Sequence, residues 1–507
     1  MNLIYKVNET IAPLSWCTFV NGGTAYVCCG RAVETRDDFF VEGAWDASFA
    51  DGNFPNAEWF CGSGGKINEN SIVFSTPTHV TSALYIIKDF RGGCWVSNSQ
   101  YLLMALTGYS YDAQYKYYEK DYNSILEGIN QYKKSIFTIP TELIQICYFR
   151  NIIVTNAGDI TISIKRSIAP FINFHDYKKR LNKAINSLVE NAKDPNRKQK
   201  YGSVTTISKG YDAPCCAVIA KNSGCRTAVT FKAEGKYAED SGIEIAQILG
   251  YEKIIEKDAL EYLQREDIVE AEYICSGELG AQISFSAFDN EFTGNLVFTG
   301  DRGDSIWGFE NPICNNEFHF IDFLNHLGTC ERKLWVGYIP VPIPLFGATA
   351  WTSIQRISQS KEMAYWSLGN DYDRPIPRRI CEEAGVRREM FGISKHGAGF
   401  TYRYDSLKRM KSRMAPTTGK AFEEYVKNHA HYDPIEVIKY YWKIKNLFLI
   451  KLGVRVKPLS SIELKNIINP TAVKYLIPWS GTLVIDKYKK ALGAENEYFN
   501  SCCRNSE

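Results

Sequence analysis

The first third of the chain alternates short apolar runs with glycine, asparagine and aspartate. Ser71–Ser75 and Leu84–Ile87 are typical of these runs, in which apolar residues are bounded by turn-forming ones. Strands of this kind bury one face each and therefore pair into sheets that pack together. The pattern predicts a β-rich front domain with two packed sheets, from residue 1 to about 165.

A helical period replaces this pattern after residue 165. Asp176 can cap a helix in which apolar residues from Tyr177 to Leu188 recur three or four residues apart, and a polar stretch follows it. We expect the boundary between two principal domains, 1–165 and 166–507, to lie at this helix.

Strands and helices alternate beyond the boundary. Alternation of this kind predicts a parallel sheet with crossover helices, and helical patterns dominate from Trp335 onward. The predicted strands are Ser203–Ile207, Thr227–Phe231, Lys253–Glu256 and Asn295–Thr299, and the predicted helices are Pro214–Lys221 and Glu239–Leu249.

Composition and charge are those of an ordinary globular protein. The 507 residues include 59 Lys+Arg and 57 Asp+Glu, a formal net charge of +2, and 45% are hydrophobic. This balance argues against a basic nucleic-acid-binding surface and against a disordered acidic tail. The 15 cysteines contain no C-x-x-C spacing and lie mostly in apolar runs, so we expect reduced, buried thiols and a cytoplasmic protein.

No targeting or membrane-spanning segment is expected. The start, Met1–Lys6, lacks a basic region followed by an apolar one. The most apolar helix-like stretch, Pro434–Leu452, carries four lysines, whereas a membrane helix needs about 20 mostly apolar residues. We expect a half-buried helix there instead.

Two acidic, glycine-bearing loops follow two strands of the predicted parallel sheet. Ligands bind such sheets at the carboxyl ends of the strands, where helix N-termini and backbone N–H groups hold anions. Each loop alone is typical of a plain turn, but together they can hold one metal–pyrophosphate unit, because a cation can link a carboxylate to a phosphate. The loops read Ser208-Lys209-Gly210-Tyr211-Asp212-Ala213 and Gly300-Asp301-Arg302-Gly303-Asp304-Ser305.

These segments resemble a family of ATP-using amide ligases. The first loop is similar to the S-G-G-x-D-S loop of ATP pyrophosphatases, and the second to the G-E-G-[SG]-D-E loop of the asparagine synthetase branch, which includes β-lactam synthetases and lasso-peptide cyclases. Residues 375–388 and 394–400 resemble the late helix of that branch and the lysine-bearing loop after it. The resemblance implies an α/β PP-loop synthetase domain, with extra C-terminal helices, over residues 166–507.

The front half is similar to the four-layer N-terminal-nucleophile glutaminase domain of the same branch. The resemblance is carried by Phe39–Asp46, Leu84-Tyr85 and Val96–Ser99. That chemistry uses a cysteine directly after the initiator methionine, where this sequence has Asn2. We therefore expect a degenerate, non-catalytic glutaminase-like domain over residues 1–165.

The resemblance implies ATP and Mg²⁺ as cofactors and assigns roles to individual residues. Asp212 and Asp304 would hold the metal, Lys395 would stabilise the leaving pyrophosphate, and Asp301 would be the base that deprotonates the amine. Glu362 would bind the amine or orient the base, although an ordinary helix explains its segment equally well. The nucleotide site would comprise Ser208, Lys209, Gly210, Tyr211, Asp212, Ala213, Phe231, Gly300 and Gly303.

The sequence departs from the family pattern inside both loops. Lys209 replaces a glycine, and a lysine rarely adopts the positive φ that a glycine can. Ala213 replaces a serine and removes a hydroxyl donor, and Arg302 and Ser305 replace a glycine and a glutamate.

The predicted function is AMP-forming synthesis of an amide bond. The enzyme would adenylate a small-molecule or peptide carboxylate and transfer the acyl group to ammonia or an amine, without hydrolysing glutamine. Intramolecular closure of a lactam or peptide ring is the alternative, and a non-catalytic ATP-binding partner protein is the third. No nucleic-acid partner is expected, and a homodimer is compatible with the sequence.

Overall fold

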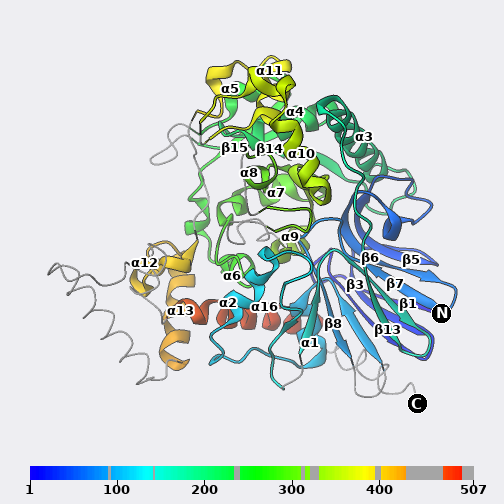
Figure 1. Ribbon diagram of the computed structural model, residues 1–507. Coiled ribbons are helices and arrows are strands. Elements are labelled where there is room, and N and C mark those ends of the chain that lie inside the picture. Colours follow the sequence, from blue (N-terminus) through cyan, green and yellow to red (C-terminus); the bar gives the residue numbers. More distant parts are fainter. Residues whose placement is uncertain are drawn as a thin grey trace, which may run out of the picture.

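Three sheets and the helices around them make up the described part of the chain (Figure 1). A computed structural model describes residues 1–88, 93–140, 143–232, 240–309, 314–319, 330–370, 372–393, 401–429 and 472–493. The predicted helix within Pro434–Leu452 and the predicted catalytic Lys395 lie outside these residues.

The front half forms the two sheets that the sequence predicts. The strands are β1 (Asn2–Asn8), β2 (Trp16–Asn21), β3 (Thr24–Gly30), β4 (Glu34–Thr35), β5 (Phe39–Trp45), β6 (Phe60–Asn68), β7 (Ser71–Ser75), β8 (Leu84–Lys88), β9 (Cys94–Ser97), β10 (Ser135–Ile136), β11 (Ile144–Cys147), β12 (Arg150–Thr155) and β13 (Ile160–Ile164). A seven-stranded sheet has the order β1-β3-β2-β9-β8-β11-β10, and a six-stranded sheet the order β13-β12-β7-β6-β5-β4. Neighbouring strands are antiparallel except β1 and β3.

An apolar core lies between these two sheets. Trp16 of the first sheet stacks on Phe74 of the second, with ring centroids 5.9 Å apart, and Val96 and Ile152 are buried in the same cluster. Successive residues of these strands point to opposite faces, and the alternate residues of β2 and β9, such as Phe19 and Trp95, are buried in a second apolar cluster that includes α1. The alternation thus fixes which face of each sheet enters the core.

Helices cover the two sheets unequally. Helix α1 (Gln100–Thr107) packs on the outer face of the seven-stranded sheet; Ser99 caps its start and Gly108, at φ 81°, ends it. On the six-stranded sheet, the front half contributes only the one-turn helix η1 (Phe54–Asn56) among its described residues, and α3 (Phe174–Ala192), which follows in the chain, contacts β5. One helical layer of the expected four-layer arrangement therefore comes from outside residues 1–165.

Helix α3 begins earlier than the sequence predicts. Asn173, rather than Asp176, is its N-cap, because the Asn173 side chain accepts a hydrogen bond from the Asp176 backbone N–H at 2.9 Å. Asp176 lies in the first turn, where its carboxylate accepts a hydrogen bond from the Ile172 N–H at 3.0 Å. The prediction of Asp176 as the cap was therefore wrong by about one helical turn. Asp176 still contributes to this helix start, because its carboxylate and the Asn173 side chain each accept a backbone N–H there.

The third sheet is parallel throughout. Its strands are β14 (Gly202–Thr206), β15 (Thr227–Phe231), β16 (Lys253–Lys257), β17 (Asn295–Thr299) and β18 (Ile339–Pro342), in the order β16-β15-β14-β17-β18. Crossover helices α4 (Asp212–Asn222) and α5 (Ile243–Ile248) follow β14 and β15. The predicted strands are confirmed to within a residue at either end.

Strand β18 was not predicted from the sequence. Pro340 and Pro342 lack the N–H that a central strand donates, and they lower the strand signal of this segment. The sheet places β18 at its edge, beside β17, where a strand tolerates proline.

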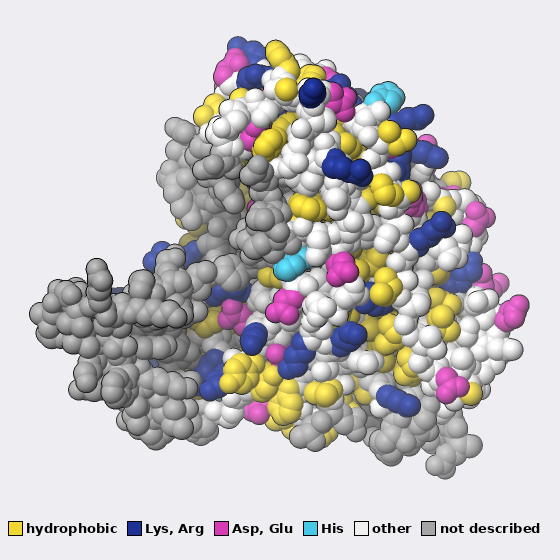
Figure 2. Space-filling model, viewed as in Figure 1, with side chains coloured by type: hydrophobic (Ala, Val, Ile, Leu, Met, Phe, Trp, Pro, Cys, Tyr) yellow, Lys and Arg dark blue, Asp and Glu magenta, His cyan; other side chains and the backbone are white. Residues whose placement is uncertain are grey.

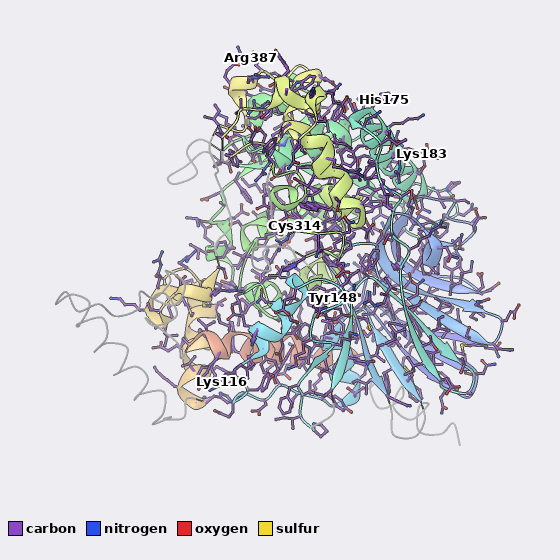
Figure 3. All side chains as sticks on the ribbon, in the orientation of Figure 1. Lys116, Tyr148, His175, Lys183, Cys314 and Arg387 are labelled. Atoms are coloured by element: carbon purple, nitrogen blue, oxygen red, sulfur yellow. The ribbon has the colours of Figure 1, made fainter. Side chains whose placement is uncertain are left out.

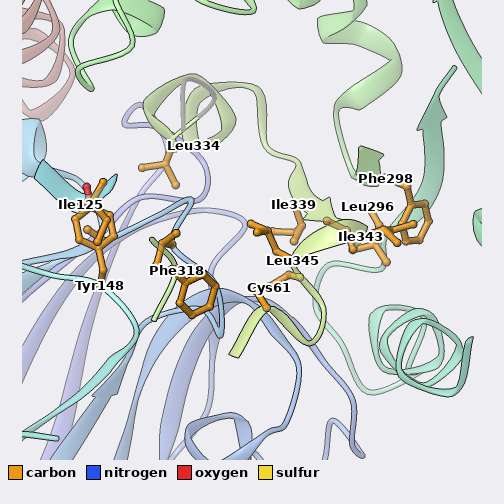
Figure 4. Packing of buried hydrophobic residues seen from close by; sticks show 14 of the residues in the cluster. Cys61, Ile125, Tyr148, Leu296, Phe298, Phe318, Leu334, Ile339, Ile343 and Leu345 are labelled. Atoms are coloured by element: carbon orange, nitrogen blue, oxygen red, sulfur yellow. The ribbon is translucent and has the colours of Figure 1, made fainter. Parts of the chain in front are cut away.

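A shared core joins the parallel sheet to the front sheets. Leu296 and Ile339 of the parallel sheet and Leu345 beyond it belong to the same buried cluster as Cys61 of β6 (Figure 4). The C-terminal helix α16 (Leu476–Leu492) packs against α1 and against α6 (Glu270–Ile274). Segments from both ends of the chain thus pack side by side below the parallel sheet (Figure 1).

The remaining elements are helices, most of them of one or two turns. They are α2 (Tyr118–Asn123), η2 (Ser124–Leu126), η4 (Glu261–Gln264), η5 (Ile283–Phe288), α7 (Asp289–Phe292), α8 (Gly303–Ile306), α9 (Cys330–Val336), η6 (Ile343–Leu345), η7 (Ala348–Ala350), α10 (Trp351–Ser358), η8 (Lys361–Trp366), α11 (Pro375–Glu383), η9 (Arg388–Met390), η10 (Tyr402–Tyr404), α12 (Leu407–Lys411), α13 (Pro416–His429) and η11 (Val473–Tyr475).

Charge is dispersed over the face of the molecule in Figure 2, where basic and acidic side chains are interspersed. His175 and Lys183 of α3 and Arg387 after α11 lie in the upper part (Figure 3). In the described residues, no helix has the length and apolar character needed to cross a membrane. The twelve cysteines whose surroundings are described are buried, as predicted, and none forms a disulfide.

Candidate active site

The two acidic loops flank the point where the parallel sheet changes direction. From β14 the chain adds β15 and then β16 on one side, and then returns to place β17 on the other side of β14. Open α/β sheets bind ligands at such a switch point, outside the carboxyl ends of the strands. Residues 207–211 follow β14 and residues 300–302 follow β17, so both loops lie at this edge.

The loops are in direct contact through two glycines. A Cβ atom on Gly300 would lie 2.9 Å from the Cβ atom of Asp212 and from the Ala213 nitrogen, and one on Gly303 would lie 2.6 Å from the Asp212 Cβ atom. Real Cβ atoms essentially never approach this closely, so neither position accepts a side chain without a shift. The predicted juxtaposition of Asp212 with the second loop is therefore present, and glycine makes it possible.

An arginine lies at the same place. Arg374, directly before α11, donates a hydrogen bond to Oδ2 of Asp212, and its side chain is 7% exposed. The charge of Asp304 as well as that of Asp212 raises the pKa of Arg374. The cluster thus contains two carboxylates and one guanidinium, a group suited to phosphate. Sequence reasoning missed Arg374, which immediately precedes the segment singled out for its resemblance.

The first loop is fixed from three sides. The Lys209 N–H donates to Asp240 at 3.3 Å, and the Gly392 N–H donates to the Lys209 carbonyl at 2.8 Å. Arg378 of α11 donates to the hydroxyl group of Tyr211, whose side chain is completely buried. These contacts hold the backbone of the loop in one shape before any ligand binds.

The substitutions in the loops have different structural outcomes. Lys209 avoids the left-handed conformation, so the replacement of a family glycine there introduces no backbone strain. Arg302 replaces the other glycine and adopts φ 67°, a conformation that is uncommon for residues other than glycine. Backbone strain of this kind concentrates at functional sites. Tyr211 is enclosed by Tyr372 and Phe391, so its side chain supports the loop.

Asp301 has the surroundings of a titratable base. Its Oδ1 accepts a hydrogen bond from Gln282 and its Oδ2 one from Thr299, both at 2.9 Å. Burial raises the pKa of Asp301 to about 6, although the two hydrogen bonds and the charge of Arg302 act in the opposite direction. A carboxyl group with this pKa is ionised at neutral pH and still a better base than an ordinary aspartate.

A second buried carboxyl group, Glu278, lies near Asp301. Burial raises its pKa well above the usual range, the charge of Asp301 raises it further, and that of Arg302 lowers it. Sequence reasoning missed Glu278 because it lies in irregular backbone, between α6 and η5. The available signal was an acid followed by Leu-Gly-Ala in an otherwise apolar stretch.

The remaining predicted residues lie in several places. Phe231 ends β15 and contacts Phe285 and Phe288, so it lies at the same sheet edge. Glu362 accepts a hydrogen bond from the Phe174 N–H at 3.1 Å, at the start of α3, and pairs with Arg379. Those contacts support α3 and do not bring Glu362 to either loop. Lys395 lies outside the described residues.

The donor set fits magnesium bound together with phosphate. Mg²⁺ prefers oxygen ligands and is usually held by one or two carboxylates plus phosphate oxygens and water. Asp212 and Asp304 supply two carboxylates. A group of three or more metal-ligating side chains, as an all-protein metal cage needs, is absent from the described residues. A metal here would therefore depend on a phosphate-bearing ligand.

Comparisons with known proteins provide little support beyond this geometry. No family model matches the sequence, and no curated protein matches it. Among solved structures, glutamine-dependent NAD+ synthetase from Acinetobacter baumannii in complex with ADP is 13% identical, with a TM-score of 0.19. The match covers 57% of this chain and 56% of the synthetase chain, so it spans little more than half of that protein. A likeness at this level carries no argument about function.

Proposed function

We propose that the protein is an ATP-dependent ligase that activates a carboxylate as its adenylate and forms an amide with ammonia or an amine. The observation that carries the proposal is the contact of Gly300 and Gly303 with Asp212 at the switch point of the parallel sheet. This contact joins two acidic loops into one site at the place where parallel sheets bind nucleotides.

The pyrophosphate part of ATP would lie over the first loop. The first turn of α4 presents N–H groups that have no acceptor within the helix, and its dipole favours an anion. Arg374 adds a guanidinium that can pair with phosphate oxygens. Asp212 and Asp304 would hold Mg²⁺, which, when bound, neutralises charge that develops on the leaving pyrophosphate. The phosphates would thus replace Asp212 as the partner of Arg374.

Asp301 would act in the second half of the reaction. The carboxylate oxygen of the substrate attacks the α-phosphorus of ATP and pyrophosphate leaves. The nitrogen of the amine then attacks the carbonyl carbon, AMP leaves, and the nitrogen loses a proton. Asp301 would accept this proton, because its pKa of about 6 leaves it ionised at neutral pH.

Glutamine is an unsuitable nitrogen source for this chain. Glutamine hydrolysis by a thiol needs an accessible cysteine with a lowered pKa. In the front half, the described cysteines are all buried, and burial raises the pKa of Cys29, Cys61, Cys94 and Cys147. We therefore propose free ammonia or a small amine as the donor.

Carboxylate-dependent exchange of labelled pyrophosphate into ATP tests the first half of the reaction. The wild type should catalyse exchange with at least one member of a panel of carboxylic acids and amino acids, and Asp212→Asn should not. Product mass then separates ring closure, in which the substrate loses one water and gains no nitrogen, from amide formation with ammonia, in which the product gains a nitrogen. Absence of exchange with every acid, together with unchanged ATP binding by Asp212→Asn, would contradict the proposal.

A further inference from the structure

Glu278 is a buried carboxyl group with unsatisfied hydrogen-bonding capacity. Its side chain is 1% exposed, and neither oxygen has a hydrogen-bond partner among the residues that the structure describes. Buried carboxyl groups are normally hydrogen-bonded, because burial without a partner destabilises the folded protein. Two acceptor oxygens at this place therefore point to a ligand that brings its own N–H donors.

The backbone around Glu278 is held in an uncommon conformation. Leu279 and Gln282 have φ values of 54° and 62°, in the left-handed region that favours glycine. The Leu279 carbonyl accepts a hydrogen bond from the Tyr402 N–H at 2.9 Å, and a Cβ atom on Gly280 would lie 2.6 Å from the Cδ2 atom of Tyr402. Tyr402 thus fixes this segment from outside.

The same segment connects Glu278 with the proposed base. Gln282, four residues after Glu278, donates a hydrogen bond to Oδ1 of Asp301. The negative charge of Asp301 disfavours ionisation of Glu278 and so raises its pKa. Two carboxyl groups that influence each other's ionisation repel each other when both are ionised, and a cation bound by both removes the repulsion.

We propose that Glu278 and Asp301 together bind the nitrogen donor as an ammonium group, either ammonium itself or the head of a small primary amine. The inference rests on the proposed function. An ammonium group has only N–H donors, and so it complements the two acceptor oxygens of Glu278 and the remaining lone pairs of Asp301.

The pair also accounts for the protons of the second half-reaction. The bound ammonium gives one proton to the carboxyl pair, which frees the lone pair of the nitrogen. The C–N bond forms, the bond between the carbonyl carbon and the adenylate oxygen breaks, and AMP leaves with that electron pair. The nitrogen loses its second proton to the pair, from which both protons pass to water. Glu278 is thus a binding and specificity residue beside the base Asp301.

Glu278→Gln tests this inference, with Glu331→Gln as the matched control. Glu331 of α9 is also a buried glutamate, and it belongs to neither acidic loop. Unlike Glu278, it accepts hydrogen bonds from Ser99 and Tyr488. For each variant, two quantities are measured: pyrophosphate exchange with the active carboxylate, and the KM for ammonium chloride, methylamine and dimethylamine in amide formation.

The expected result is selective for the nitrogen donor. Glu278→Gln should raise the KM for the donor about tenfold or more and leave pyrophosphate exchange within about twofold of wild type. Glu278→Asp keeps the carboxyl group, so its KM for the donor should lie between those of the wild type and Glu278→Gln. Glu331→Gln should change neither the KM nor the exchange rate. If only ammonium saturates the rate of amide formation, the donor is ammonium itself, and if methylamine also does so, the donor is a small primary amine. Dimethylamine, a secondary amine, should be inactive.

Four outcomes would overturn the inference. An unchanged KM in Glu278→Gln would remove the role in donor binding, and a parallel loss of pyrophosphate exchange would show that Glu278 supports the nucleotide site instead. A wild type without any exchange would overturn the proposed function and this inference with it. If Glu278→Gln does not fold, an unchanged KM in Glu278→Asp would overturn the role in donor binding in the same way.

Discussion

Gly303 lies so close to Asp212 that a Cβ atom at position 303 would come within 2.6 Å of the Asp212 Cβ atom. Strands β15, β16 and β17 lie between the two residues in the sequence. Asp212 follows β14 and Gly303 follows β17, and these two strands are neighbours in the sheet. The position of the Asp212 carboxylate therefore depends on the absence of a side chain at residue 303.

Gly303→Ala should displace Asp212 and impair the use of ATP. The added methyl group forces Asp212 or the second loop to move, which should reduce pyrophosphate exchange about tenfold or more. Gly419→Ala in α13 is the matched control, because its Cβ atom would meet Lys411 of α12 at 3.4–3.6 Å, which is ordinary van der Waals contact. Exchange at the wild-type rate in a correctly folded Gly303→Ala protein would contradict the proposed role of this contact.

Arg374→Met should separate metal binding from nucleotide binding. Arg374 is paired with Asp212, and its removal frees that carboxylate for Mg²⁺ while it deletes a phosphate partner. We expect tighter Mg²⁺ binding without nucleotide and about tenfold weaker ATP binding by calorimetry. Arg387→Met, at an arginine whose side chain is 70% exposed, should change neither. Unchanged ATP affinity in Arg374→Met would count against phosphate contact.

The acid limb of the pH profile should report Asp301. Its pKa of about 6 predicts that amide formation declines below about pH 6 as the carboxylate becomes protonated. Thr299 donates a hydrogen bond that stabilises the charged form and lowers this pKa, so Thr299→Val should move the limb to higher pH. Thr418→Val, which removes a hydrogen bond to Glu270, should not move it. A shift in the opposite direction would contradict Asp301 as the base.

Lys165 predicts a pH dependence of stability that is independent of catalysis. Its side chain is buried, and among the hydrogen bonds and ion pairs described it makes one, which it donates to the Ser75 hydroxyl group. Desolvation lowers the pKa of Lys165 from 10.5 to about 7. Between these values the unfolded chain binds more protons than the folded one, so this group makes stability rise with pH, by up to about 1.4 kcal/mol per pH unit.

Urea unfolding of the wild type and Lys165→Met at pH 7 and pH 9 measures this effect. The wild type should gain stability relative to the variant as the pH rises, because the variant lacks the group. An identical change in both proteins would show that Lys165 is not responsible.

The sequence was sufficient for the elements with a clear period. Strands β15 and β17 have the predicted bounds, because each five-residue segment has three apolar residues and lies between charged or glycine residues. Strand β18 was missed because of its two prolines, and an edge position explains why the fold tolerates them. Periodicity thus predicted four strands of the parallel sheet, including the edge strand β16, but not the proline-bearing edge strand β18.

The candidate site was predictable only where one segment carried several signals. Asp212 and Asp304 stood out through the glycines and acids around them, and the structure brings their loops together. Arg374 comes from a distant segment with several arginines, and nothing local distinguishes the one that reaches Asp212. Glu278 lies between Gly277 and Leu279, which both have left-handed backbone, in a segment without a period, so only the three-dimensional structure shows the influence of Asp301 on it.

Binding of Mg²⁺·ATP to the wild type and to Asp212→Asn tests the central claim most directly. Equilibrium dialysis with labelled ATP, with and without Mg²⁺, measures both affinities without knowledge of the carboxylate substrate. We expect Mg²⁺-dependent binding of one ATP per chain and a loss of about tenfold or more in Asp212→Asn. Equal binding by the two proteins, or no binding by the wild type, would contradict a nucleotide site between β14 and β17.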